Sequence, residues 1–98
     1  EQTAIIGLGA GGHGRVIADI LARSGSYQLH AWLDHATHLH GSFISGSKVL
    51  GNDSLLAELN AAGISHAFIG VGSVGNASIR RKVAKHAISA GFTLPTII

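Results

Sequence analysis

The feature that most constrains the fold is a glycine-rich segment, Gly7-Leu8-Gly9-Ala10-Gly11-Gly12-His13-Gly14. An apolar, β-branched run from Thr3 to Leu8 leads into it and is typical of a strand that is buried on both faces. Apolar residues then recur at helical spacing between Gly14 and Ser24, and Gly25 follows as an expected helix end. A glycine-rich turn between a buried strand and a helix therefore predicts the opening of an α/β domain.

The rest of the chain continues this alternation of strands and helices. Further strands are predicted over 28–33 and 66–71, with a short candidate at Val49-Leu50, and the chain ends inside another strand-like run, 93–98. Helices are predicted from Asn52 or Asp53 to Gly63 and over 76–90. Residues 34–47 are polar and predict a loop. Because crossovers between parallel strands are right-handed, the order favours a Rossmann-like three-layer domain, a short parallel β-sheet flanked by helices, over residues 1–98.

The predicted helix over 76–90 is amphipathic. Its apolar face is expected to carry Ile79, Val83, Ala87 and Ile88, and its polar face Arg81, Lys82, Lys85 and Ser89.

The composition excludes several classes of protein. Hydrophobic residues make up 46% of the 98 residues and charged residues 12%, which indicates a compact fold rather than a disordered chain. The chain has no cysteine, so disulfides, thiolate metal sites and thiol catalysis are excluded. A net charge of +2 does not indicate nucleic-acid binding, and no apolar run approaches the length of a membrane span. We therefore expect a soluble, cytoplasmic protein without membrane or nucleic-acid partners.

The glycine-rich segment satisfies the pattern G-x-G-x-x-G twice, from Gly7 and from Gly9. At such a turn the glycines let a ligand approach the backbone, and the N–H groups that open the helix favour an anion such as phosphate. The competing interpretation is that these glycines only permit a tight turn and close packing of the helix.

Two further positions are predicted at the same edge of the sheet. Asp34 ends the second strand, where an acidic side chain in a dinucleotide-binding fold accepts hydrogen bonds from ribose hydroxyls. Its alternative roles are an exposed loop carboxylate or a helix cap. Gly70 and Gly72 end the strand over 66–71, and open α/β sheets bind ligands at the carboxyl ends of their strands.

The histidines do not assemble a catalytic or metal site. His13 lies inside the glycine-rich segment, where it could contact a phosphate, stack on a ligand, or only cap the helix. His35, His38 and His40 lie in the polar loop without carboxylate or thiolate partners at fixed spacing, so no metal is predicted. No nucleophile, base and acid can be combined, and no catalytic residue is predicted in this chain.

Several motifs together resemble one family. They are Ile5 to Leu21 with its Gly-Ala-Gly-Gly-His-Gly core, Trp32-Leu33-Asp34, Val49-Leu50-Gly51, Phe68-Ile69-Gly70-Val71-Gly72, Ile79-Arg80 and Gly91-Phe92. The sequence resembles the N-terminal domain of bacterial sugar acyltransferases of the PglD/NeuD type along its whole length.

This resemblance implies the substrate-binding domain of an acetyl-CoA-dependent sugar N- or O-acetyltransferase. Such enzymes act on nucleotide-linked amino sugars, or on sialic acid in some members, in surface glycan or glycoprotein synthesis. The implied substrate-binding residues are Gly9, Gly11, Gly12, His13, Gly14, Asp34, His35 and Gly72. The family's catalytic histidine, acetyl-CoA site and homotrimer contacts lie in a following left-handed β-helix that this chain lacks, so this chain alone is expected to be inactive. Many relatives carry a second acid where this chain has His35.

Two alternatives fit the same motifs. The glycine-rich segment and Asp34 would equally serve the NAD(P)-binding domain of an oxidoreductase. A non-catalytic module that senses nucleotides and regulates a partner is the other alternative.

Overall fold

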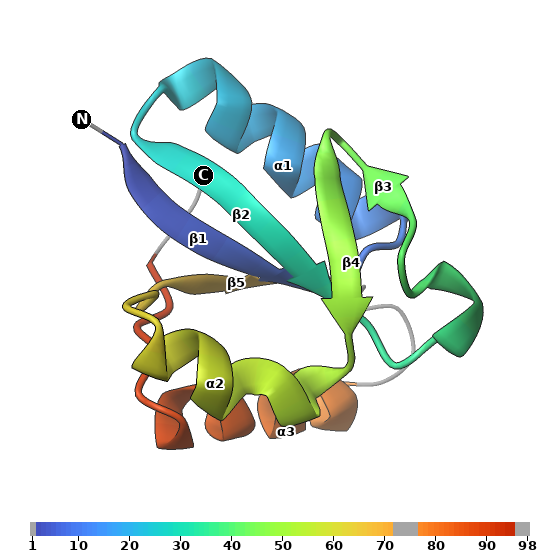
Figure 1. Cartoon of the computed structure of the whole chain (residues 1–98), viewed down its shortest axis with the longest axis vertical. Helices are drawn as coiled ribbons and strands as arrows, with labels where there is room; N and C mark the ends of the chain where they lie inside the picture. The colour runs from blue at the N-terminus through green and yellow to red at the C-terminus, as the bar shows by residue number, and fades with distance from the viewer. Residues whose placement is uncertain (1, 72–76, 96–98) are drawn as a thin grey trace.

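The computed structural model describes residues 2–71 and 77–95. Strands and helices alternate in the described part as the sequence predicts, except for an additional β3–β4 hairpin, and Figure 1 shows their arrangement. The elements are β1 (Thr3–Leu8), α1 (Gly12–Ser24), β2 (Tyr27–Leu33), η1 (Thr37–Leu39), β3 (Phe43–Ile44), β4 (Ser47–Gly51), η2 (Asp53–Leu55), α2 (Leu56–Ala61), β5 (Ala67–Ile69) and α3 (Ala77–Ser89), where η denotes a 3₁₀ helix.

The sheet has the order β3-β4-β2-β1-β5. The pairs β4–β2, β2–β1 and β1–β5 are parallel, whereas the short β3 pairs with β4 in the antiparallel direction. A parallel bridge between His66 and Thr93 places the start of the C-terminal segment beyond β5. The chain therefore builds outward from β1 on one side, through β2 and β4, and then on the other side, which is the doubly wound Rossmann-like arrangement.

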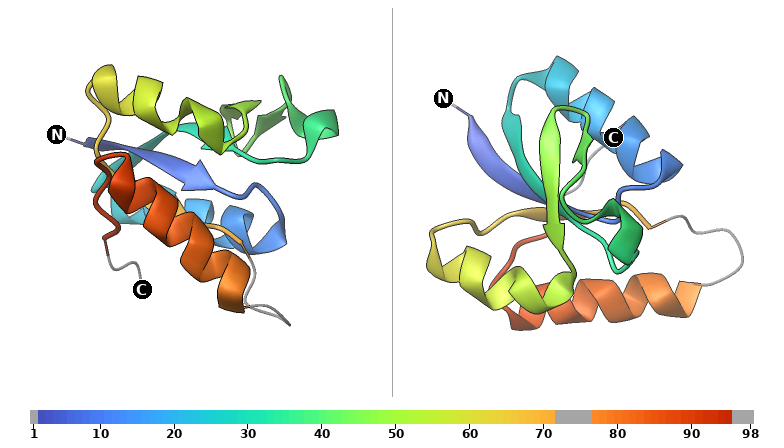
Figure 2. Two further views of the ribbon diagram at one scale, coloured as in Figure 1. Left: turned by 90° about the horizontal axis from the view of Figure 1, so that it is seen from below. Right: turned by 45° about the vertical axis from the view of Figure 1, so that its right-hand side comes forward.

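Helices cover both faces of the sheet, with α1 on one face and α2 and α3 on the other (Figures 1 and 2). Two buried clusters separate these layers. One contains Ile6, Leu8, Leu56, Ala87 and Phe92 and joins the sheet to α2 and α3. The other contains Ile5, Ala18, Leu21, Trp32 and Phe68 and joins it to α1. Residues on β1 alternate between the two clusters because successive side chains of a strand point to opposite faces. The apolar composition of β1 follows from this double burial.

Trp32 organises the core beneath α1. Its side chain is 0% exposed, and its indole N–H donates a hydrogen bond of 2.8 Å to the carbonyl oxygen of Ile44. The indole meets the ring of Phe68 edge to face, with ring centroids 5.6 Å apart. Such a buried aromatic pair, with its polar atom satisfied, is a stable anchor for the surrounding backbone.

The polar loop predicted over 34–47 contains more structure than expected. It holds η1 and β3, and a two-residue turn, Ser45-Gly46, joins β3 to β4. Both turn residues have positive φ, 53° for Ser45 and 81° for Gly46, as the tight hairpin turn that matches strand twist requires. The short strand candidate at Val49-Leu50 is the middle of β4, which is longer than predicted.

The remaining differences concern boundaries and one helix face. The 3₁₀ helix η2, Asp53–Leu55, stands in place of the first turn of the predicted helix. Strand β5 is shorter than the predicted strand 66–71, and Asn76 lies outside the described residues. On α3 the predicted apolar face is partly wrong, because Ile79 and Ile88 are 44% and 61% exposed. The predicted Val83 and Ala87 do pack against the sheet, and Ala84, which was not predicted, packs beside them. None of the helices formed by the described residues is long and apolar enough to cross a membrane.

Candidate functional site

The glycine-rich segment lies at the point where the strand order reverses, between the half of the sheet that contains β2 and the half that contains β5. It follows β1, which has β2 on one side and β5 on the other. The Gly9 N–H donates to the carbonyl oxygen of Leu33 at 2.8 Å, and the Gly70 N–H donates to that of Leu8 at 2.7 Å. The carboxyl ends of β2, β1 and β5 are thus joined at one edge. Open α/β sheets bind ligands outside this point because the flanking loops diverge there.

Some of these glycines are required by packing. A Cβ atom on Gly14 or Gly70 would overlap the carbonyl oxygen of Gly9. A Cβ on Gly7 would collide with the Trp32 ring. Gly9 itself has a φ of 107°, a conformation that residues with a side chain rarely adopt. These positions fit the interpretation of a tight turn with close helix packing.

Gly11 and Gly12 are different. A Cβ atom on either would meet no atom of the described residues within 4 Å, and neither residue has a positive φ. Both are exposed at the start of α1. The fold of the described residues gives no reason for glycine at these two positions. Open space over an exposed backbone is what a ligand that approaches the main chain requires.

The start of α1 is electrostatically suited to an anion. Gly11 occupies the N-cap position, where no side-chain hydrogen bond caps the helix, and the first turn has no acidic residue. The first N–H groups of a helix lack partners within the helix, and its dipole adds partial positive charge there. His13 is exposed in this first turn. Phosphate is therefore the ligand group that this end of α1 fits best.

Asp34 connects the glycine-rich segment to the end of β2. One carboxylate oxygen accepts a hydrogen bond of 2.9 Å from the Ala10 N–H, and the other accepts one of 2.9 Å from the Ala36 N–H. The sequence did not predict these bonds. They give the carboxylate a structural role, because it ties the two loops together. Each oxygen keeps a further lone pair, so Asp34 can hold the loop and still accept a hydrogen bond from a ligand.

His40 supports the same turn, since its Nε2 lies 2.6 Å from the carbonyl oxygen of Asp34. His35 is exposed beside Asp34, and His38 is exposed on η1. In the part of the chain that the structure describes, no three His, Asp or Glu side chains gather to hold a metal ion. Gly72, the last predicted site residue, lies outside the described residues.

A small cavity of about 80 Å³ opens at the strand ends beside the glycine-rich segment. Its lining is Leu8, Gly9, Leu33, Asp34, His35, Asp53, Val71 and Val83. It therefore brings together three of the predicted site residues, Gly9, Asp34 and His35. Asp53 was expected only as a possible helix cap, and no spacing in the sequence indicated that it would lie at this edge.

Two larger cavities lie elsewhere. One of about 520 Å³ is lined by residues near the amino ends of β1 and β2, including Gln2, Tyr27 and Gln28. The other, of about 330 Å³, lies between Ile17, Phe68 and Arg80. Neither is lined by the glycine-rich segment or by Asp34. We place the candidate site at the smaller cavity because a nucleotide in this fold lies mostly on the open loop, so cavity volume alone is a poor guide.

Comparison with solved structures places the fold beside sugar acetyltransferases. A variant of perosamine N-acetyltransferase from Caulobacter crescentus, in complex with CoA and GDP-perosamine, is 28% identical with a TM-score of 0.84, over 97% of this chain and 42% of that one. The acetyltransferase domain of PglB from Neisseria gonorrhoeae, in complex with acetyl coenzyme A, is 31% identical with a TM-score of 0.75, over 99% of this chain and 44% of that one. This chain thus spans less than half the length of either structure.

A more distant match supports the fold alone. UDP-D-quinovosamine 4-dehydrogenase from Vibrio fischeri is 17% identical with a TM-score of 0.78, over 96% of this chain and 76% of that one. No curated protein sequence matches the chain significantly. The model of the PglD N-terminal domain family matches residues 4–87, which include most of β1, the glycine-rich segment and most of α3. The chain therefore belongs to the PglD N-terminal domain family.

Proposed function

We propose that this chain is the nucleotide-sugar-binding domain of an acetyl-CoA-dependent sugar acetyltransferase that serves bacterial surface glycan or glycoprotein synthesis. Membership of the PglD N-terminal domain family supports this proposal. So do the two similar acetyltransferases, one of which is described with a nucleotide sugar and both with CoA or its acetyl thioester. Binding is the role that the described residues suit, because they offer an anion site and a cavity without an assembled nucleophile and base.

Gly11 and Gly12 are the observation that carries the proposal. They are exposed, no packing among the described residues requires them, and they lie at the start of α1, which has no side-chain cap. In our proposal the diphosphate of the ligand lies over Gly11 and Gly12, with His13 and Gly14 at the same helix start. Gly9 lies below the ligand, and Asp34 and His35 bind the nucleoside. Gly72, which lies outside the described residues, is proposed as a ligand-binding residue from the family resemblance alone.

The whole protein extends the proposal. A left-handed β-helix would follow this domain, hold acetyl-CoA and form a homotrimer, as the family resemblance implies. A histidine of that part would take a proton from the sugar amine or hydroxyl while the sugar nitrogen or oxygen attacks the thioester carbonyl. The protonated histidine would then give the proton to the sulfur, so that CoA leaves as the thiol. His13 is not assigned that role, and this chain alone is expected not to transfer acetyl groups.

Calorimetric titration tests the proposal. The chain is titrated with UDP, GDP, CMP, UDP-N-acetylglucosamine and NAD at one salt concentration. We expect a nucleoside diphosphate or its sugar to bind more tightly than NAD. Tighter binding of NAD would instead support the oxidoreductase interpretation, and binding of none of these compounds would contradict a nucleotide site at the glycine-rich segment.

A further inference from the structure

The order of the parallel strands predicts where the base of a bound nucleotide lies. With the diphosphate over the loop after β1, the ribose lies at the end of the adjacent β2, beside Asp34. The next strand outward is β4, and neighbouring strands lie about 4.8 Å apart. A nucleotide that extends in this direction brings its base to the segment that follows β4. That segment contains Asn52 and Asp53.

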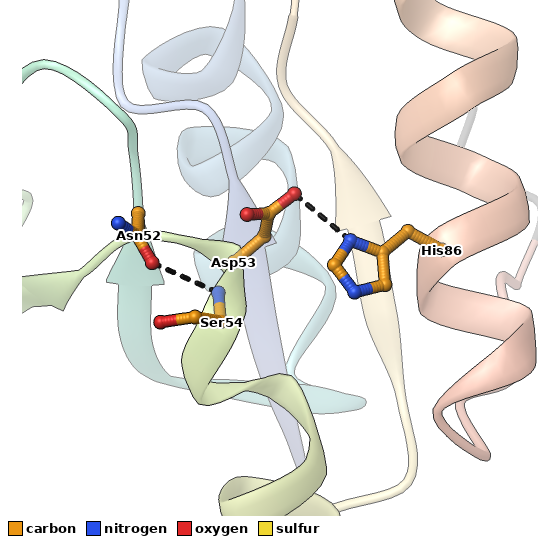
Figure 3. Close-up of polar contacts among 4 residues, drawn as sticks. All are labelled: Asn52, Asp53, Ser54 and His86. Carbon is orange, nitrogen blue, oxygen red and sulfur yellow. Dashed lines mark hydrogen bonds and ion pairs between the residues drawn. The ribbon is translucent and has the colours of Figure 1, made fainter.

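Asp53 reaches the candidate site from this segment. Asp53 lines the same small cavity as Asp34 and His35, although it follows β4 and they follow β2. One oxygen of its carboxylate lies 3.0 Å from Nδ1 of His86 on α3, and the second oxygen points away from the imidazole (Figure 3). The carboxylate is 49% exposed, so it is accessible to a ligand from solvent.

The local backbone also holds Asp53 in place. The Asn52 side chain accepts a hydrogen bond of 2.9 Å from the Ser54 N–H, which fixes the turn on both sides of Asp53 (Figure 3). The cavity walls beside it are apolar, formed in part by Leu33, Val71 and Val83. Apolar walls with a carboxylate at the rim fit the flat faces and the polar edge of a nucleobase.

The hydrogen-bonding pattern of a carboxylate distinguishes the bases. An ionised carboxylate only accepts hydrogen bonds. Guanine presents two adjacent donors, N1–H and the N2 amino group, to such a partner. Uracil presents one N–H between two carbonyl acceptors, and cytosine and adenine each present an amino group beside an acceptor nitrogen. Guanine is therefore the base that two carboxylate oxygens match best, whereas the other bases direct an acceptor at the negative charge.

We propose that Asp53, oriented by His86, is a specificity-determining residue that selects guanine as the base of the bound nucleotide. This inference rests on the proposed function, since it assumes a nucleoside diphosphate over the glycine-rich segment. The Asp53 oxygen that contacts His86 keeps a further lone pair, so both oxygens of this carboxylate can accept hydrogen bonds from guanine.

Calorimetric titration with GDP and UDP tests the assignment on the 98-residue chain, on Asp53→Asn and on Asp53→Glu. The unaltered chain should bind GDP about 10-fold or more tightly than UDP, which is the discrimination expected of a matched pair of hydrogen bonds. In Asp53→Asn an amide, with one acceptor oxygen and one donor NH₂ group, replaces the two acceptor oxygens. The affinity for GDP should fall about 10-fold, and the affinity for UDP should change less than about 2-fold. Asp53→Glu keeps two acceptor oxygens and should retain a preference for GDP.

Glu58→Gln is the matched control. It makes the same change of charge on exposed Glu58 of α2, which does not line the cavity, and it should leave the ratio of GDP to UDP affinity unchanged. Equal binding of GDP and UDP by the unaltered chain would overturn the assignment but leave the proposed function intact. An unchanged ratio of GDP to UDP affinity in Asp53→Asn would likewise overturn the assignment and leave the proposed function intact. If the chain binds neither nucleotide, the proposed function and the assignment both fail.

Discussion

Substitution of alanine at Gly14 and at Gly12 separates the glycines that the fold needs from those that a ligand needs. At Gly14 the new methyl group overlaps the Gly9 carbonyl oxygen and lies 3.0 Å from a carbon of the Trp32 ring. Neither neighbour can move easily, because the Gly9 N–H is bound to Leu33 and the indole is buried. Overpacking of this kind costs about 3 kcal/mol, of which better helix propensity returns about 1 kcal/mol. The expected loss of about 2 kcal/mol lowers the melting temperature by about 8–16 °C.

At Gly12 the new methyl group would meet no atom of residues 2–71 or 77–95 within 4 Å. The free energy of unfolding should stay the same or rise by about 0.5 kcal/mol, because alanine restricts the unfolded chain. Nucleotide affinity should nevertheless fall about 10-fold, since the methyl group occupies the space over the helix start that we assign to the diphosphate. Thermal denaturation followed by circular dichroism and calorimetric titration with a nucleoside diphosphate measure the two effects. Unchanged affinity of Gly12→Ala, or unchanged stability of Gly14→Ala, would refute this division.

Three further substitutions test other parts of the structure. Asp34→Ala removes the acceptors of two backbone N–H groups, including that of Ala10, so unfolding in urea should show a loss of about 1–3 kcal/mol, and titration a weaker affinity for the nucleotide. Unchanged values in both assays would remove Asp34 from the site. Trp32→Phe removes the donor of the Ile44 carbonyl oxygen and leaves a gap in the core. The free energy of unfolding in the same urea assay should fall by about 2–4 kcal/mol. Arg23→Ala breaks the exposed ion pair with Asp19, one helical turn away, and should change the free energy of unfolding by less than about 0.5 kcal/mol. A larger loss would contradict this expectation.

The sequence predicted the parts of the fold that follow from local patterns. The run into Gly7 alternates between two buried clusters and therefore has no polar face, which identifies a central strand. The β3–β4 hairpin was missed because β3 has only two residues, too few to show a period. Its signal was the Ser45-Gly46 pair, a common turn dipeptide. Ile79 and Ile88 fit the helical period but lie on the solvent side. Tertiary packing decides how α3 is rotated about its own axis, and the sequence period alone does not show it.

The candidate site was predictable to a similar extent. Its location follows from a glycine-rich turn after a buried strand and an acidic residue at the end of the next strand. The hydrogen bonds of Asp34 to Ala10 and Ala36 were not predictable, because they depend on how far the two loops approach each other. Asp53 was missed for the same reason, since it joins His86 from 33 positions away and reaches the cavity only through the placement of β4.

The most direct test of the nucleotide site is the change in backbone amide resonances of the 98-residue chain when a nucleoside diphosphate sugar is added. We expect the largest changes at Gly11, Gly12 and His13, with smaller changes at Asp34 and His35. Changes confined to the larger cavity near Tyr27 and Gln28, or no changes at saturating ligand, would contradict a nucleotide-sugar site on the glycine-rich segment.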